Sequence, residues 1–362
     1  AGIAGASVAS ELASDRRVIL LEREDTPGYH TTGRSAALFT PTYGPPQIRA
    51  LTRASSAFFK TPDSAFCDVP LVRQRDVLIV ARPDQVEALR KATDNLATET
   101  GLEVLDAHAT RAAQPLLRPG YAASAVLNRD SYDIDVDALH RAWLREFKSR
   151  GGELVLEAQV VAVQREADAW RIDTPNRSLR AASVINAAGA WADVIADMAG
   201  ATPVGLVPKR RTVAVVDSPP GYPDLGESPM VIDVDEEFFL KPEAGRLLVS
   251  PADETPSEPT DARPDEWDIA VGIDRAQRAF DLDVKRVVSA WAGLRCFVAD
   301  GLPVVGEDPA LPGFFWLCGQ GGYGIQTAPA MARLATAVFR GEGIPQDLRE
   351  EGVDPVALQP GR

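Results

Sequence analysis

The sequence is poor in the residues that build metal centres and redox dithiols. Among 362 residues it has three cysteines and three histidines: Cys67, Cys296, Cys318, His30, His108 and His140. The cysteines are far apart and form no CxxC pair, and the histidines show no ligand spacing. We therefore expect no metal site and no redox dithiol. A sparse, odd number of cysteines is typical of a reducing cytoplasm.

Long apolar runs and an excess of basic charge are also lacking. No run approaches the ~18–20 apolar residues that span a bilayer, and no signal peptide is evident before the glycine-rich start. The formal net charge of −14 disfavours nonspecific nucleic-acid binding. We expect no integral membrane segment and no nucleic-acid partner. The predicted location is the cytoplasm, with peripheral attachment to the inner face of the membrane as the alternative.

What is present at the N-terminus is a glycine turn, a helical pattern to about Ala13, an apolar run over 18–21 and then Glu22. Gly2 and Gly5 match the second and third glycines of GxGxxG, which let a backbone approach a pyrophosphate at a helix N-terminus. Glu22 follows Gly2 by 20 residues, the spacing at which a carboxylate reaches ribose hydroxyls. Its alternative interpretation is a solvated strand end. A strand should precede this turn, and none is present, so the sequence is either truncated or lacks the first strand.

The rest of the chain alternates helical and strand patterns. Helices are predicted at 46–60, 83–100, 137–150 and about 327–340, and strands at 78–80, 153–163, 168–173, 182–189 and 314–317. Residues 208–300 favour a β-rich section, and residues 250–268, rich in Pro, Asp and Glu, favour a surface loop. The predicted fold is α/β (α+β) with two interleaved domains. Residues 1–68, 134–200 and 296–362 would form a discontinuous Rossmann-type domain, and residues 69–133 and 201–295 an antiparallel-sheet substrate domain.

Three further motifs point to a bound cofactor. Gly33-Arg34-Ser35 offers backbone and hydroxyl donors for a second phosphate, although Ser35 would also suit a helix N-cap. Residues 186–191 form a strand end of small residues, against which a cofactor or a closely packed helix could lie. Residues 319–324 hold four glycines, and the helix after them would point its positive end at the cofactor. The alternative for this last motif is a plain helix-initiating turn.

The order of these motifs resembles the D-amino-acid oxidase superfamily of flavoproteins, and within it the bacterial D-arginine dehydrogenases. The resemblance runs from end to end and is carried by residues 27–37 (PGYHTTGRSAA), 208–211 (PKRR), 291–295 (WAGLR) and 320–327 (QGGYGIQT). It implies non-covalently bound FAD and hydride transfer from the substrate Cα to flavin N5. The imino acid would then be hydrolysed to a 2-oxo acid and ammonia. The implied partners are an amino acid and an unidentified electron acceptor, which could be oxygen, a quinone or another carrier.

The resemblance also implies the residues that hold the cofactor. They are Gly2, Ile3, Ala4, Gly5, Glu22, Arg23, Gly33, Arg34, Ser35, Val161, Ala188, Gly189, Trp191, Arg295, Gly321, Gly322, Tyr323, Gly324, Ile325 and Gln326.

Arg211 and Arg295 fall where the superfamily binds the substrate carboxylate, a task to which arginine forks are suited. Both could instead form structural ion pairs, and Arg210 is as plausible as Arg211 from the sequence. Tyr43 matches a loop tyrosine that closes over the carboxylate, although a packed loop aromatic is an equal alternative. Gly322 would bring backbone groups close to the substrate and the isoalloxazine.

The residues of the substrate pocket depart from the D-arginine dehydrogenases. Thr40 matches a residue near the flavin, and Met230 and Ile232 keep an apolar wall. Val77 stands where those enzymes pair a glutamate with the substrate guanidinium, and the neighbouring Asp76 should face the opposite side of its strand. Two further polar residues are replaced by Leu38 and Phe239. We therefore expect an FAD-dependent enzyme acting on CH–NH2 groups that prefers neutral or hydrophobic D-amino acids over D-arginine.

Two kinds of alternative stay open. Within the superfamily, the chain could be a glycine or sarcosine-type amine oxidase, or a 2-hydroxy-acid oxidoreductase. Outside it, the chain could bind flavin without turnover, as a truncated paralogue would. In the enzyme, no side-chain base is required, so the rate should rise with pH as the substrate amine loses its proton.

Overall fold

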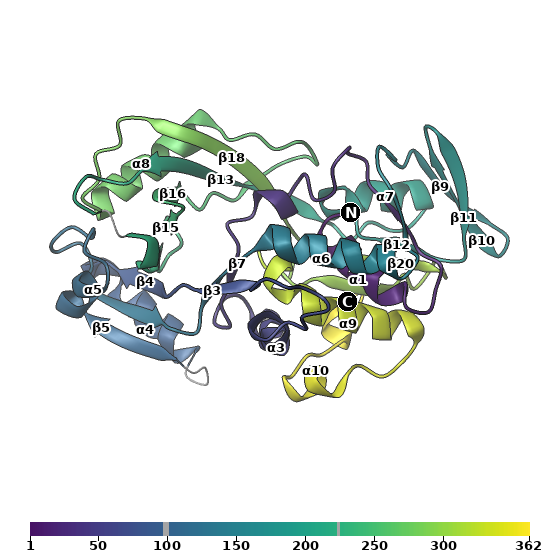
Figure 1. The fold of residues 1–362 in the computed structure, drawn as a ribbon, viewed down its shortest axis with the longest axis horizontal. Coiled ribbons are helices and arrows are strands. Elements are labelled where there is room, and N and C mark those ends of the chain that lie inside the picture. The colour runs from purple at the N-terminus through teal and green to yellow at the C-terminus, as the bar shows by residue number, and fades with distance from the viewer. Residues whose placement is uncertain (97–100, 223–224) are drawn as a thin grey trace.

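The computed structural model describes residues 1–96, 101–222 and 225–362. Its elements gather in two groups, which lie on the right and the left of Figure 1. The right-hand group contains both chain termini and most of the helices. None of the helices within these described ranges is long and apolar enough to cross a bilayer.

The right-hand group is built on short parallel strands. β1 (Ile19–Leu21) pairs in parallel with β8 (Glu153–Val155), and β12 (Val184–Asn186) pairs in parallel with β20 (Phe314–Cys318). β19 (Val304–Glu307) adds to β20 in the antiparallel direction. Between β1 and β12 no strand pairing is present among the described residues. A separate sheet flanks this layer, with β10 (Ala169–Thr174) between β9 (Ala162–Glu166) and β11 (Arg177–Ala181).

Helices cover these strands. α1 (Ile3–Leu12) begins directly after Gly2 and packs against α9 (Gly324–Arg340) and α6 (Val136–Ser149). The other helices of this group are α2 (Pro46–Ala54), α3 (Ser56–Lys60), α7 (Ala192–Ala199) and α10 (Gln346–Glu350). Val8 and Leu12 of α1 join Leu317 of β20 and Leu334 of α9 in one apolar core. The glycine turn before α1 is therefore fixed by helix packing on both sides.

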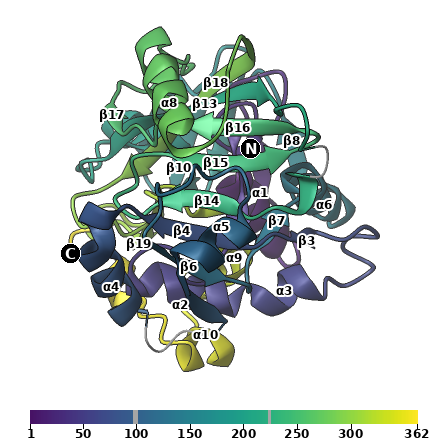
Figure 2. The same cartoon turned by 90° about the vertical axis from the view of Figure 1, so that its left-hand side faces the viewer.

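The left-hand group is dominated by one large sheet, which Figure 2 shows from its outer side. Within the described residues this sheet has nine strands, in the order β17-β13-β16-β15-β14-β4-β6-β5, with β18 also paired to β13. Their bounds are β4 (Val77–Ala81), β5 (Leu102–Asp106), β6 (Ser124–Asn128), β13 (Val207–Asp217), β14 (Met230–Asp233), β15 (Phe239–Glu243), β16 (Arg246–Ser250), β17 (Thr255–Pro256) and β18 (Val287–Phe297). Most pairs are antiparallel, and β4 with β14 is parallel.

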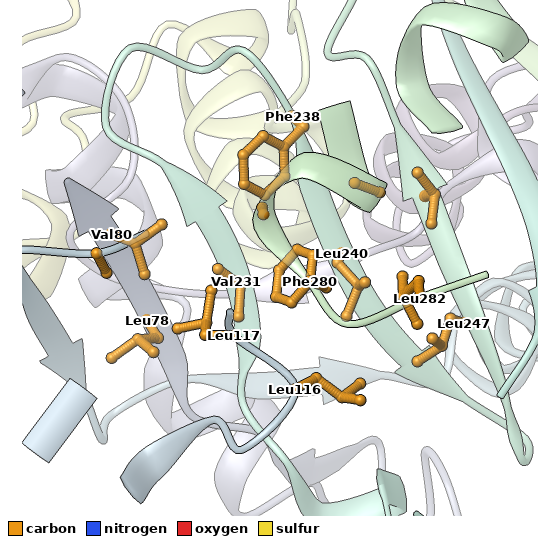
Figure 3. Packing of buried hydrophobic residues seen from close by; sticks show 14 of the residues in the cluster. Leu78, Val80, Leu116, Leu117, Val231, Phe238, Leu240, Leu247, Phe280 and Leu282 are labelled. Carbon is orange, nitrogen blue, oxygen red and sulfur yellow. The ribbon is translucent and has the colours of Figure 1, made fainter. Parts of the chain in front are cut away.

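Both faces of this sheet are apolar, as strand alternation requires of a sheet covered on two sides. On the outer face, α8 (Glu266–Ala279) packs against a core that includes Leu78, Val231, Leu240 and Leu247. Figure 3 shows side chains of the sheet gathered around Phe280, which follows α8. On the inner face the cluster comprises Val77, Val213, Val215, Met230, Phe239 and Leu248. This inner apolar face looks toward the first group of elements.

A small sheet joins the two groups. β7 (Tyr132–Ile134) lies between β2 (Leu38–Phe39) and β3 (Val72–Gln74), so residues from three distant parts of the chain meet there. The remaining helices, α4 (Val86–Asp94) and α5 (Ala107–Ala113), flank the far end of the large sheet.

The mixed α/β architecture predicted from the sequence is confirmed, and the strands of 201–295 join those of β4, β5 and β6 in one sheet. The proposed domain limits stay a prediction. The helix predicted at 83–100 is present as α4, and its residues 97–100 lie outside the described residues. The prediction of a loop over 250–268 was wrong in part, since α8 begins at Glu266 and continues to Ala279. Gly272 in mid-helix weakens the helical pattern, but the close approach of Pro251 requires it, since a Cβ there would lie 3.0 Å from Pro251.

Candidate active site

A cavity of about 1000 Å³ lies between the two groups of elements and runs from α1 to the inner face of the large sheet. Its size is at the upper end of the ~300–1000 Å³ that is usual for ligand sites. The lining includes residues 1–5, 16–23, 28–32, 34–36, 158–160, 177–191, 293–296 and 317–322, together with Arg211 and Phe239, whereas Gly33 is not part of it. Motifs that lie far apart in the sequence therefore line the same cavity.

The first end of the cavity is formed by α1 and β1. Gly2, Ile3, Ala4 and Gly5 line it, and the first-turn N–H groups of α1 that lack an intrahelical partner lie there. The Ile3 N–H donates to Thr32 Oγ1 at 3.0 Å, which ties the turn to the segment that follows β1. Glu22 closes β1 with its side chain almost buried, and its Oε1 accepts from the Glu24 N–H at 3.1 Å. A carboxylate beside free backbone donors suits a ribose next to a pyrophosphate.

Two aromatic rings line the cavity near Glu22. The guanidinium of Arg23 lies over the Trp191 ring, 4.6 Å from its centroid, and the His30 ring lies 4.8 Å from the same tryptophan. His30 Nε2 pairs with Glu24 Oε1 at 2.9 Å, while its Nδ1 is buried without a hydrogen-bond partner in the described structure. Gly189 has φ +57°, and nothing lies within 4 Å of the place a Cβ would take. The residues present therefore fit a dinucleotide, with donors, a carboxylate and open backbone along one wall.

The three residues of the Gly33-Arg34-Ser35 motif have different roles. Arg34 and Ser35 line the cavity, yet the Arg34 guanidinium pairs with Asp261 and donates to the Ala262 carbonyl at 2.8 Å. That side chain therefore links the motif to the loop before α8. Ser35 follows the 3-10 turn Thr32–Arg34, so the alternative prediction that Ser35 caps a helix start was wrong. A Cβ on Gly33 would lie 2.7 Å from the Gly28 carbonyl oxygen, so this glycine is required for the close turn.

The second end of the cavity contains two arginines. Arg211 on β13 and Arg295 on β18 both line it; Arg211 is almost fully buried and Arg295 is partly buried. The Arg295 Nη1 donates to Tyr43 Oη at 3.4 Å, and the Tyr43 ring packs edge-on against Tyr323. Gly322 lies directly against Arg295, since a Cβ there would be 2.9 Å from the guanidinium carbon. The four residues named from the resemblance as catalytic are thus brought together.

The electrostatics of this end favour an anion. Burial, followed by the charge of Arg295, lowers the pKa of Arg211. For Arg295 burial acts in the same direction, but interaction with Tyr43 and nearby negative charge raises its pKa overall. Both guanidinium groups stay charged in the ordinary working range, because an arginine pKa starts above 12. Two like charges held together at the end of a cavity are stabilised by a carboxylate that both can bind.

Strand alternation decides between the neighbouring arginines Arg210 and Arg211. Arg210 turns to the outer side, where its Nη2 pairs with Asp268 of α8 at 2.6 Å. Arg211 turns inward, with its Nε donating to the Asp253 carbonyl at 2.8 Å and its Nη2 to Glu254 Oε1 at 3.1 Å. Arg211 is therefore the candidate ligand of a substrate.

Next to the arginines lies the inner apolar face of the large sheet. Phe239 lines the cavity directly, and Val77, Met230 and Ile232 belong to the apolar cluster around it. Asp76 lies outside this cluster, where its carboxylate accepts from Gln74 at 2.9 Å. The opposite orientation of Val77 and Asp76 follows the strand prediction. No carboxylate from β4 replaces the glutamate of the D-arginine dehydrogenases at this position.

The other predicted residues differ in how close they come to the cavity. The Thr40 N–H donates to Gln326 Oε1 at 3.1 Å, and Gln326 Nε2 is buried without a hydrogen-bond partner in the described structure. Gly321, Gly324 and Ile325 are in the lining. Val161, predicted to bind the cofactor, is half exposed and lies outside the lining, whereas Val160 is part of it.

Three residues near the site were missed by the sequence analysis. Thr32 lay inside a motif that was quoted, and its role as acceptor for α1 became visible only in the fold. Asp253 and Glu254 contact Arg211 from a segment 42 and 43 residues further along the chain, in the stretch expected to be a surface loop. No pattern in the sequence relates these positions.

Comparisons with known proteins agree with this arrangement. The family model described as DAO, FAD dependent oxidoreductase, matches residues 1–338. FAD-dependent oxidoreductase domain-containing protein 1 of Bos taurus is 32% identical over 181 residues, which cover 44% of this chain and 36% of that protein. The match thus spans about a third of that relative's length.

Glycine oxidases match over almost the whole chain. The enzyme of Pseudomonas aeruginosa is 24% identical over 377 residues, covering 99% of this chain and 96% of that protein. The crystal structure of glycine oxidase from Geobacillus kaustophilus has a TM-score of 0.85 at 20% identity, covering 100% and 96% of the two chains. These findings support the flavoprotein superfamily, but they do not support the narrower resemblance to D-arginine dehydrogenase.

Proposed function

This chain belongs to the DAO family of FAD-dependent oxidoreductases, and from that premise we propose that it oxidatively deaminates D-amino acids with neutral or hydrophobic side chains. Its cofactor is FAD, for which the α1 turn, Glu22 and the Trp191 wall provide the fitting donors and surfaces. The observation that carries the proposal is that Arg211 and Arg295 both line the cavity beside the apolar wall around Phe239.

The two arginines would bind the substrate carboxylate and fix its distance from the cofactor. Arginine forks bind carboxylates in a planar, bidentate manner, so they orient as well as attract. With the carboxylate held at Arg211 and Arg295, the apolar side chain lies toward Phe239. Tyr43, whose hydroxyl already accepts from Arg295, covers the carboxylate from the opposite side. Orientation of this kind is a main contribution of a protein to cofactor-dependent chemistry.

When bound, FAD would supply the acceptor for the hydride that leaves the substrate Cα. The two described lining residues with a titratable carboxylate or imidazole, Glu22 and His30, belong to the dinucleotide end of the cavity. No side-chain base therefore lines the arginine end within the described residues, and the substrate must react with its amine already neutral. The amine nitrogen supplies the electron pair for the C=N bond, and water hydrolyses the imino acid to a 2-oxo acid and ammonia.

Anaerobic reduction of the flavin tests the proposal. The holoenzyme is mixed without oxygen with single D- and L-amino acids, and bleaching of the flavin absorption is followed. We expect rapid bleaching with D-leucine, D-methionine and D-phenylalanine, and slower bleaching with D-arginine and the L-enantiomers. A higher kcat/KM for D-arginine than for those three would contradict the pocket assignment. No bleaching by any amine or hydroxy acid would leave a flavin-binding protein without turnover.

A glycine oxidase-type amine oxidase is the second candidate, favoured by the nearly full-length match to the Pseudomonas aeruginosa enzyme. The two candidates differ in what the apolar wall does. If glycine and sarcosine are the substrates, the wall makes no contact with a side chain. A kcat/KM for glycine or sarcosine above that for D-leucine would establish the second candidate over the first.

A further inference from the structure

We propose that Glu254 occupies a second carboxylate position beside the arginine pair and thereby restricts the site to amino acids with one carboxylate. The inference rests on the proposed function, because it assumes that Arg211 and Arg295 bind the substrate carboxylate. It concerns a residue of the β16–β17 connection, outside every motif used to locate the site.

Three cationic side chains share one face of neighbouring strands. Lys209 and Arg211 are two residues apart on β13 and therefore point to the same side. Lys209 is directly opposite Arg295 in the antiparallel pairing of β13 with β18. Opposed residues of this kind have Cβ atoms about 5 Å apart. Arg211 and Arg295 of the carboxylate clamp line the cavity, and Lys209 extends this row of cations just outside the lining.

Glu254 uses both of its oxygens on this row. Oε1 accepts from Arg211 Nη2 at 3.1 Å, and Oε2 accepts from Lys209 Nζ at 2.8 Å. The Asp253 carbonyl accepts a hydrogen bond from Arg211 Nε at 2.8 Å. One edge of the guanidinium is therefore bound by two consecutive residues, Asp253 and Glu254. Arg211 is left with Nη1 for a ligand in the cavity. Glu254 therefore both orients Arg211 and occupies the space between Arg211 and Lys209.

The carboxylate of Glu254 stays charged. Partial burial acts to raise its pKa, but the hydrogen bond from Lys209 and the charges of Lys209, Arg211 and Arg295 lower it overall. The wall around Phe239 consists of apolar side chains, which offer no charged partner to a second carboxylate. A second carboxylate that turned toward Lys209 instead would have to approach or displace the charge of Glu254, and juxtaposed like charges are strongly unfavourable. A monocarboxylate substrate needs no such displacement. Specificity of this kind comes from an interaction that opposes the wrong ligand.

The test compares two substrates of similar size, D-leucine and D-glutamate, with holoenzyme carrying Glu254→Gln. The amide keeps the shape and removes the charge, and the Glu254 side chain is 41% exposed, so the fold should tolerate it. We expect the ratio of kcat/KM for D-glutamate to that for D-leucine to rise about tenfold or more. The KM for D-leucine should rise about two- to fivefold with kcat unchanged, as expected for loss of a half-exposed ion pair.

Two further variants sharpen the result. Glu258→Gln, which changes an exposed carboxylate just after β17, is the matched control and should leave the ratio unchanged. In the double variant Glu254→Gln with Lys209→Gln, the gain for D-glutamate should disappear, because Lys209 is the group that the second carboxylate would bind. A ratio within twofold of wild type in Glu254→Gln, or equal losses for both substrates, would overturn the proposal.

Binding measurements separate this inference from the proposed function. Dissociation constants of butyrate and glutarate are measured calorimetrically on the holoenzyme, with no turnover required. Glu254→Gln should tighten glutarate relative to butyrate about tenfold. If no amino acid is oxidised but glutarate gains in this way, the proposed function fails and the role of Glu254 stands. If amino acids are oxidised but neither the kcat/KM ratio nor the affinity ratio changes, the proposed role of Glu254 is wrong and the proposed function stands.

Discussion

A single added methyl group at Gly322 would test the carboxylate clamp. A Cβ at this position lies 2.9 Å from Arg295 Cζ and 3.0 Å from its Nε and Nη1. Ordinary carbon contacts begin at about 3.5 Å, so the guanidinium or the turn would have to shift by about 0.5 Å or more. Arg295 is partly buried and hydrogen-bonded to Tyr43, and a shift away from Gly322 would lengthen that bond. The backbone at Gly322 is not in the left-handed region, so any effect of Gly322→Ala comes from the contact of the new Cβ with Arg295.

The expected result for Gly322→Ala is a loss in catalysis with little loss of fold. A displacement approaching 1 Å at a positioning group costs about 10²-fold in rate, and we expect a decrease in kcat/KM for D-leucine of that order. FAD should remain bound, because Glu22 and the α1 turn lie at the other end of the cavity. Steady-state kinetics and the flavin content of the purified protein measure the two parts separately.

The matched control is Gly226→Ala, where a Cβ meets no atom of the described residues within 4 Å and the backbone is also free of positive φ. It should behave as wild type in both measurements. A Gly322→Ala enzyme with kcat/KM within about twofold of wild type would refute the assignment of Arg295 as a rigid ligand. Loss of flavin in the same variant would instead place the damage in cofactor binding, which the present geometry does not predict.

Four other predictions concern the pocket, the cofactor and pH. Val77→Glu should raise kcat/KM for D-arginine relative to D-leucine about tenfold, and an unchanged ratio in kinetic assays would contradict the pocket assignment. The same substitution should lower the free energy of unfolding by about 1–3 kcal/mol, because it buries a carboxylate in an apolar cluster. Glu22→Ala should weaken FAD about 10- to 100-fold in titrations of the apoprotein, the worth of charged hydrogen bonds; unchanged affinity would argue against a ribose contact. The kcat/KM for D-leucine should rise with pH to a plateau as the substrate amine becomes neutral, since Arg211 keeps its charge although its pKa is lowered; a flat profile from about pH 6 to about pH 10 would count against the mechanism. Burial lowers the pKa of His140, so the folded state binds a proton less well than the unfolded chain. The stability present above about pH 6.5 should therefore be lost as pH falls through the lower folded-state pKa, and His140→Gln should flatten this dependence in urea titrations.

Local motifs of the site could be predicted from the sequence. Gly2, Gly5 and Glu22 are related by the geometry of one turn, one helix and one strand, so their spacing carries the information. The apolar run at 182–189 likewise predicted a buried parallel strand; β12 (Val184–Asn186) does pair in parallel with β20, but Val184 and Ile185 are only partly buried. These inferences need only short-range structure, which propensity and periodicity describe well.

The contacts that complete the site depend on strand register. The choice between Arg210 and Arg211 is settled by which side of β13 each side chain takes, and that side is set by pairing with β18. The contact of Glu254 with Lys209 depends on the pairing of β17 with β13. In this pairing Pro256 lies opposite Lys209 and Thr255 lies opposite Arg210, although a long connection separates the two strands. A periodic pattern in one segment does not specify its register with another. The sequence therefore indicated the type of site but left its electrostatic balance unpredicted.

The position of the clamp relative to the cofactor is fixed by backbone rather than by adjustable side chains. Arg295 lies on β18, and the next residue, Cys296, accepts a hydrogen bond from the Gly321 N–H at 2.9 Å. That bond ties β18 to the glycine turn that precedes α9, so the arginine and the turn at the cofactor cannot move independently. Val77, Met230 and Phe239 of the apolar wall belong to β4, β14 and β15, which this bond does not tie to the turn. Substrate preference should therefore change through Val77, Met230 or Phe239 while the carboxylate position stays constant, and pocket variants selected for a new side chain should keep an unchanged affinity for acetate. A pocket variant that alters acetate binding as strongly as it alters substrate choice would show that the wall and the clamp are coupled.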